Sequence, residues 1–198
     1  MRLQKLESMI LLVILSACAW SKAVAQTENA NPASDLPRQY SGTAIGQAGV
    51  AAGKSIGVDV YVTRWTTGEE VQDFAATLAK SGGDGLVKAL DKTKDVGRLA
   101  PTGFVGSGFR IARSRPTPGG GAHIVMVTNR PISFGEAYHG TRSRDYQFGI
   151  VVLDVDKDGK GTGSLAPICK IKFNKQNQLE VEHYGQKPLR LANVRRVK

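Results

Sequence analysis

Cysteine is nearly absent from this sequence, since Cys18 and Cys169 are the only two among 198 residues. We expect Cys18 to be removed or acylated during export, which leaves Cys169 without a partner in its own chain. This excludes an internal disulfide framework. The fold must therefore depend on a buried core, and roughly 160 residues are enough to form one in a single domain.

Motifs of the common catalytic and metal sites are also missing. His123, His139 and His183 lie far apart without ligand spacing, and neither a serine elbow nor a helical zinc-protease motif occurs. His123 and His183 fall in strand-like segments and are interpreted as ordinary strand residues. Cys169 follows Ile168 in an apolar strand-like run, which favours a buried and inert thiol.

No apolar run is long enough for a membrane-spanning helix, which needs about 20 residues. The N-terminal run from Met9 to Trp20 has 12 residues, follows Arg2 and Lys5, and ends before Lys22. A basic start, a short apolar run and small residues after it are typical of a secretory signal peptide. We therefore expect no transmembrane segment in the mature chain.

This leader can be cut in two ways. Ala23 and Ala25 satisfy the small-residue rule of signal peptidase, so residues 1–25 would be removed as a signal peptide. The stretch LSAC, ending at Cys18, also resembles a lipobox, in which the cysteine is lipidated and anchors the protein. The spacing from the apolar run favours the cut after Ala25. We expect an extracytoplasmic protein, periplasmic or secreted, with a lipoprotein anchored through Cys18 as the alternative.

Positive charge is concentrated in the second half of the chain. From residue 101 to 198 there are sixteen Lys or Arg against seven Asp or Glu, whereas residues 26–100 have eight against nine. This asymmetry favours an anionic partner, such as an envelope component or a small ligand. The alternative is a cationic surface that serves only solubility.

The fold expected from the residue pattern is α+β and mainly antiparallel β. Residues 26–38 are polar, contain two prolines and predict a flexible linker. Residues 39–198 predict a single β-rich domain, a curled sheet of about eight or nine strands, barrel-like or a sandwich. The strand-like segments are YSGTAIGQ (40–47), SIGVDVYVTRW (55–65), VGRLAP (96–101), GSGFRIARSRP (106–116), GAHIVMVTNRPI (121–132), YQFGIVVLDV (146–155), GSLAPICKIKFN (163–174), LEVEHYG (179–185) and LRLANVRRV (189–197).

One helical insertion, at about residues 68–93, interrupts this pattern. Thr67 and Glu70 have the spacing of a capping box, and SGGDG, from Ser81 to Gly85, predicts a break with Asp84 capping a second, shorter helix. The insertion is therefore expected to be a helical hairpin. Its apolar positions at helical period are Val71, Phe74, Ala75, Leu78, Leu86, Val87 and Leu90.

The register of one hairpin can be predicted from its side chains. If Phe173 faces Leu179, apolar pairs fall on one face and opposite charges on the other, which stabilises a half-buried sheet. The further pairs are then Ile171 with Val181, Lys172 with Glu180 and Lys170 with Glu182.

The stretch AGVAAGKS, from Ala48 to Ser55, matches a loose phosphate-loop pattern. Such a loop must open onto a helix N-terminus to bind phosphate, but the following residues IGVDVYVTRW predict a strand. We therefore expect a hairpin loop and no nucleotide.

The stretch DVDKDGKGTGSL places Asp154, Asp156 and Asp158 at the first, third and fifth positions of a calcium loop, with Gly159 at the sixth. The twelfth position is Leu165, where a bidentate glutamate is needed. A plain hairpin, turning at Asp158 and Gly159, is the leading interpretation. A weak calcium site is the alternative, and no other cofactor is expected.

The connection FGEAYHGTRSRDYQFG, residues 134–149, concentrates polar and aromatic side chains between two strands. Long loops of this composition often hold binding sites, and arginine is suited to carboxylate or phosphate ligands. The alternative is that its arginines only satisfy the loop itself. The candidate binding residues are Glu136, Tyr138, His139, Arg142, Arg144 and Asp145.

Three segments resemble a group of exported bacterial proteins of no assigned activity. They are RWTTGEEVQDFAATLAKSGGDGLVKALDKTKDVGRL, GFVGSGFRIARSR and RPISFGEAYHGTRSRDYQFG. The resemblance covers most of the mature chain and implies bacterial origin and export. It implies no ligand and no catalytic residue.

Charge asymmetry without catalytic geometry favours a non-enzymatic domain that binds a ligand or an envelope component through its basic second half. An extracytoplasmic hydrolase or other enzyme, using Glu136, His139 or Asp145, is the alternative. A purely structural subunit is the third class.

Overall fold

The computed structural model describes residues 36–132, 145–184 and 187–197. The predicted signal peptide, the lipobox Cys18 and most of the linker lie outside these residues. The described elements are β1 (Arg38–Ile45), η3 (Gly49–Ala51), β2 (Ser55–Val62), α2 (Gly68–Asp91), β3 (Gly97–Pro101), β4 (Ser107–Phe109), β5 (Ile111–Pro116), β6 (Ala122–Val127), β7 (Phe148–Val155), β8 (Lys160–Phe173), β9 (Leu179–His183) and β10 (Leu189–Arg196).

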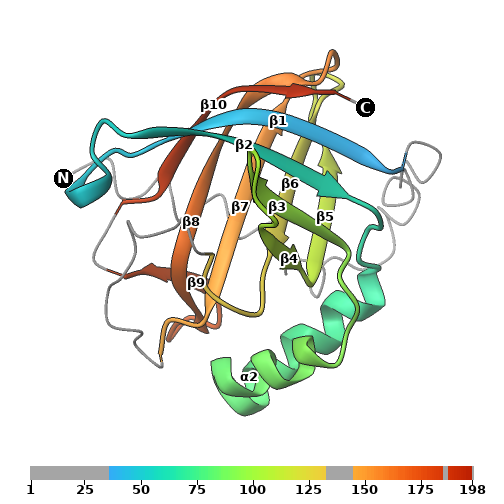
Figure 1. The fold of residues 1–198 in the computed structure, drawn as a ribbon. Helices are drawn as coiled ribbons and strands as arrows, with labels where there is room; N and C mark the ends of the chain where they lie inside the picture. The colour runs from blue at the N-terminus through green and yellow to red at the C-terminus, as the bar shows by residue number, and fades with distance from the viewer. Residues whose placement is uncertain (1–35, 133–144, 185–186, 198) are drawn as a thin grey trace.

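All ten strands belong to one sheet that curls into a nearly closed barrel (Figure 1). The strand order is β4-β3-β2-β1-β10-β8-β7-β6-β5, and β9 pairs with the far part of β8. Every pairing between these strands is antiparallel. The predicted α+β class, with a mainly antiparallel, curled, barrel-like sheet and one helical insertion, is confirmed.

The two edges of the sheet belong to one continuous run of chain. β4, at one edge, pairs with β3, and β5, at the other edge, pairs with β6. In the sequence only Arg110 lies between β4 and β5. The run that the sequence predicts as one strand therefore changes its pairing partner at Arg110. This change of partner brings the sheet round on itself, because one end of the run belongs to each edge.

Thr66 spans the seam left by this change of partner. Its backbone N–H donates to the carbonyl of Ala112 at 2.8 Å, and its hydroxyl accepts from the Ala112 N–H at 2.9 Å. Thr66 is only 1 % exposed. A buried backbone N–H needs a partner, so the hydroxyl satisfies a group that the sheet leaves unpaired.

The barrel interior is filled by side chains from all parts of the sheet. Alternate residues of each strand point inward, as the period of two requires. The largest of these buried side chains include Tyr40, Leu99, Phe109, Ile124, Met126, Leu153, Leu165 and Leu191. The barrel is thus a packed core.

A second apolar cluster lies on the outside of the barrel. It joins the outer faces of β6, β7 and β8 to buried leucines of α2, namely Leu78, Leu86 and Leu90. Figure 1 shows the helix lying against the outside of the sheet. The sheet is therefore buried on both faces in this region.

The helix begins and bends largely where the sequence predicts. Thr67 and Glu70 form the capping box, since the Thr67 side chain accepts from Glu70 N and the Glu70 side chain accepts from Thr67 N. The helical hairpin expected here is a single helix, α2, and the predicted break is a kink in it at one residue, Gly82, whose φ of 65° suits glycine. Gly82 precedes the second helical part, so the prediction of Asp84 as its cap is wrong. No helix among the described residues has the length and apolarity to span a membrane.

The predicted register of the β8–β9 hairpin is confirmed at every position. Phe173 pairs with Leu179, and the three further pairs follow as expected. The ion pair, however, runs diagonally from Lys172 to Glu182, with 2.8 Å between Nζ and Oε2.

Replacing Thr66 by valine tests the seam. Thr66→Val keeps the size of the side chain but leaves the buried Ala112 N–H without an acceptor, so we expect the free energy of unfolding to fall by about 1–3 kcal/mol. Urea unfolding measures this loss. Thr66→Ser keeps the acceptor oxygen and should lose less than Thr66→Val. A valine variant as stable as the original protein would contradict this account of the seam.

Candidate ligand-binding pocket beneath helix α2

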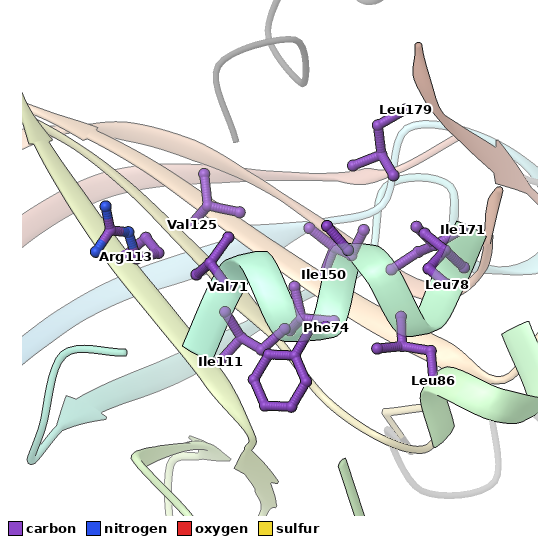
Figure 2. Close-up of a pocket in the computed structure, with 12 residues that line it drawn as sticks. Val71, Phe74, Leu78, Leu86, Ile111, Arg113, Val125, Ile150, Ile171 and Leu179 are labelled. Carbon is purple, nitrogen blue, oxygen red and sulfur yellow. The ribbon is translucent and has the colours of Figure 1, made fainter. Parts of the chain in front are cut away.

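An apolar pocket lies between α2 and the outer face of the sheet (Figure 2). The centre of a water molecule can occupy about 50 Å³ of the pocket, and the whole hollow, with the solvent at its mouth, measures about 570 Å³. Arg113 is the one lining residue with a polar side chain. The lining residues are Val71, Phe74, Ala75, Leu78, Leu86, Ile111, Arg113, Val125, Val127, Ile150, Ile171 and Leu179.

The helical wall comes from an apolar face that the sequence predicts. Val71, Phe74, Ala75 and Leu78 lie at positions i, i+3, i+4 and i+7 of α2, so they share one face. All four line the pocket. Ala75 is the smallest of them, and it leaves space that a larger side chain would fill.

The sheet wall consists of neighbouring rows across three strands. Ile111, Val127 and Ile150 are paired across β5, β6 and β7. Arg113 and Val125 form the next row on the same face, because they lie two residues along their strands. The outward side of these strands is therefore apolar where the helix covers it.

Arg113 lies at one end of the pocket, beside Val71 and Val125, and Leu86 and Leu179 lie toward the other end (Figure 2). One guanidinium nitrogen of Arg113 donates to the Thr66 carbonyl at 2.8 Å. The residues that the structure describes provide no ion pair for Arg113. The pocket wall is thus apolar, and the Arg113 guanidinium lies at its edge, without a carboxylate partner among the described residues.

The acidic residue just before this wall in the sequence, Glu70, is already paired. Glu70 Oε2 lies 2.8 Å from the Arg64 guanidinium and also accepts from the Thr67 backbone N–H. The hydrogen bond from Arg64 lowers the pKa of Glu70 from its ordinary value, although partial burial opposes this. Glu70 therefore stabilises the start of α2 as a carboxylate.

The polar loop at residues 134–149 is described only from Asp145 onward. Of its six candidate residues, Asp145 is described and exposed, whereas Glu136, Tyr138, His139, Arg142 and Arg144 lie outside the described residues. Their grouping into a binding or catalytic site stays a prediction.

The described end of this loop contacts both α2 and the β8–β9 hairpin. Gln147 Nε2 donates to Asp84 of the helix, and the Tyr146 hydroxyl donates to Glu182. The hydrogen bond to Glu182 raises the pKa of Tyr146, and the hydrogen bond from Lys172 lowers the pKa of Glu182. These contacts join the loop to the elements that form the far end of the pocket.

The three aspartates of the calcium pattern lie in a tight hairpin between β7 and β8. Asp156 Oδ1 accepts from the backbone N–H of Asp158 and of Lys160, each at 2.9 Å. Asp154 Oδ1 lies 2.6 Å from His123 Nδ1 on the adjacent strand. The hairpin interpretation is confirmed, and the described part of the chain contains no group of three or more His, Cys, Asp or Glu placed to hold a metal ion. Calcium binding stays a prediction.

The phosphate-loop pattern ends in a strand, as predicted. Ser55 is the first residue of β2, and the preceding helical turn, η3, has only three residues. The loop opens onto a strand and not onto a helix N-terminus, so the geometry required for a phosphate loop is not formed at Lys54 and Ser55.

Cys169 is fully buried on β8, and its thiol donates to the Phe148 carbonyl at 3.4 Å. Burial raises the pKa of this thiol to about 12. The prediction of a buried thiol is confirmed. His123 and His183 lie in β6 and β9, as predicted for strand residues.

Comparisons with protein-family models, with curated proteins and with solved structures found no match to this chain. The class of protein is therefore defined by its own geometry. It is a nearly closed antiparallel barrel whose outer face carries an apolar pocket under a kinked helix.

Replacing Glu70 by glutamine tests whether this carboxylate makes the free energy of unfolding depend on pH. The pKa of Glu70 is lower in the folded state than in the unfolded state, where it is about 4.3. The ionised carboxylate therefore stabilises the folded state above about pH 4.3, and this contribution is lost as the pH falls through the pKa of the folded state. The pair is partly exposed, so Glu70→Gln should cost about 0.2–1 kcal/mol at pH 7 and much less at pH 3. Urea unfolding at both values measures this, with Glu69→Gln in the same helical turn as control. An equal loss at both pH values would contradict it.

The buried thiol should be inert to Ellman's reagent in the native protein. Burial keeps Cys169 protonated, and only the thiolate reacts. We expect full labelling of Cys169 in guanidinium and none within an hour in buffer at pH 8. Cys169→Ala identifies its share of the signal. Rapid labelling of Cys169 in the native protein would show that the burial is not maintained in solution.

Proposed function

We propose that this protein is a non-enzymatic extracytoplasmic binding protein, and that the pocket beneath α2 takes a small ligand with an apolar body and one anionic group. A medium-chain fatty acid has this chemistry. The export expected from residues 1–25 is consistent with this proposal.

The observation that carries the proposal is an apolar wall that ends at one arginine, whose aliphatic stem lines the pocket and whose guanidinium lies at the edge of it. Eleven of the twelve lining residues are apolar, and Arg113 is the exception. Ligand sites commonly combine an apolar lining with few polar groups that orient the ligand. Arg113 is one of the sixteen Lys and Arg residues in the basic second half of the chain, and the proposal gives this one cation the role of binding the anionic group.

The apolar wall can supply much of the binding free energy. Each buried methylene group contributes about 0.8 kcal/mol. The hollow measures about 570 Å³ and this includes solvent at its mouth, so the helix and the sheet can cover only part of a long chain. Affinity should therefore rise with chain length over the first few carbons and then level off.

Arg113 can supply the preference for an anion. A hydrogen bond to a charged group contributes about 1.5–3 kcal/mol. Its guanidinium already donates to the Thr66 carbonyl at 2.8 Å, which holds the side chain near the pocket. The other nitrogens can donate to a carboxylate, a sulfonate or a phosphate.

Three probes of equal chain length test the proposal: octanoate, 1-octanol and octylammonium. We expect octanoate to bind at least tenfold more tightly than 1-octanol, and octylammonium to bind more weakly than either. Calorimetric titration or displacement of anilinonaphthalene sulfonate measures the affinities. Arg113→Gln should bring octanoate to the level of 1-octanol, whereas Arg98→Gln, on β3, should have no effect.

A matched pair of alanines on α2 tests the location. Ala75 lines the pocket, whereas Ala76 is exposed. Ala75→Phe fills the hollow and should abolish binding of octanoate, and Ala76→Phe should leave it unchanged. Binding that ignores the head group, or that survives Ala75→Phe, would exclude this pocket as the site.

A further inference from the structure

The turn between β3 and β4 exposes two large apolar side chains next to each other. Phe104 is 71 % exposed and Val105 is 85 % exposed. Isolated apolar residues on a surface are common, but adjacent ones at the tip of a hairpin suggest a contact with an apolar phase. Neither residue contributes to the core or to the pocket beneath α2.

This exposure is built into the turn. Phe104 N donates to the Pro101 carbonyl and Thr102 N to the Gly57 carbonyl, each at 2.9 Å. The turn ends at Gly106, which has a φ of 79°, and a side chain there would meet the Leu99 carbonyl. The backbone therefore holds the two apolar side chains outward instead of letting them fold onto the sheet.

Strand register places this turn at one end of the barrel. Ile45 pairs with Ser55 and with Arg190, and β3 ends at Pro101, opposite Val58 on β2. We name this end, with the connections at residues 46–54, 102–106, 128–132 and 187–188, the Ile45 end. Gln47 Nε2 donates to the Pro188 carbonyl at 2.9 Å, which ties two of these connections together.

The Ile45 end is basic. Its connections and the adjoining start of β10 contain Lys54, Arg130, Lys187 and Arg190, and none of these described connections contains a carboxylate. Three carboxylates come near it from other segments: Asp91 accepts from Asn129, Asp145 precedes β7 by three residues, and Asp59 on β2 pairs with Ala100 and accepts from the Ser41 hydroxyl. Cations therefore outnumber carboxylates here.

We propose that the Ile45 end docks reversibly on an anionic lipid bilayer. Phe104 and Val105 enter the boundary between headgroups and acyl chains, where apolar side chains are stabilised. The surrounding lysines and arginines are attracted to the anionic headgroups. The two features support each other, because the charges lie around the same end that presents the apolar turn.

A bilayer fits this end better than a second copy of the chain does. Two copies meeting through the turn would bring their basic ends together, and like charges oppose such an interface. An anionic surface instead attracts the cations of one copy.

Sedimentation with lipid vesicles tests the proposal. One set of vesicles contains phosphatidylcholine alone, and the other also contains 30 % phosphatidylglycerol. All protein variants have the same N-terminus. The purified protein should bind the anionic vesicles at low salt, bind them at least tenfold more weakly in 0.5 M salt, and bind the neutral vesicles weakly. Phe104→Ser combined with Val105→Ser should weaken binding to the anionic vesicles at least tenfold.

Two controls separate the turn from the rest of the molecule. Val197 is 56 % exposed at the opposite end, beside Gln39, so Val197→Ser should leave vesicle binding unchanged. Lys54→Gln combined with Lys187→Gln should weaken it and reduce its dependence on salt. Ala75→Phe should affect octanoate but not vesicles, so the two proposals fail separately.

The proposal is overturned if the protein does not bind anionic vesicles, or if the double serine variant binds them as well as the original protein does. It is also overturned if the serine variant changes only the oligomeric state, as measured by analytical ultracentrifugation, because the turn would then be a contact between copies.

Discussion

The change of pairing partner at Arg110 is the constraint on which the rest of the structure depends. One run of chain, from Ser107 to Pro116, begins on β3 and ends on β6, so it joins both edges of the sheet. Arg110 itself is held at this point, because its guanidinium donates to the Thr93 carbonyl and lies 3.3 Å from Asp95. Without this run the barrel would keep two open edges, which are prone to pair with other chains.

The pocket follows from that closure. Beyond Arg110 the chain places Ala112 inside the barrel and Ile111 and Arg113 outside, because side chains alternate along a strand. The outer apolar rows then need a cover, and α2 provides it over most of their length. Thr66 connects the two features, because its hydroxyl accepts from the Ala112 N–H at the seam and its carbonyl accepts from the Arg113 guanidinium beside the pocket. The cover is incomplete near Ala75, and the remaining space is the pocket.

Local patterns predicted much of this fold because their physics is local. The capping box at Thr67 and Glu70 needs only neighbouring backbone groups, and the β8–β9 register follows from side chains that must match on both faces. The diagonal ion pair from Lys172 to Glu182 could not be read from register alone, because long side chains reach past their direct partners. Sequence reasoning also missed Arg113. It appeared as one cation among sixteen in the second half, and only packing shows what surrounds it.

The sequence by itself determined the strands, the capped and interrupted helix, the buried thiol and the hairpin in place of a phosphate loop. Each of these depends on periodicity or on contacts between residues close in the chain. Only the tertiary structure decided where the sheet closes, which face the helix covers and which cation borders the pocket. These features join residues far apart in sequence, such as Thr66 with Ala112 and Ala75 with Ile150. Their free energy comes from packing that no local pattern specifies.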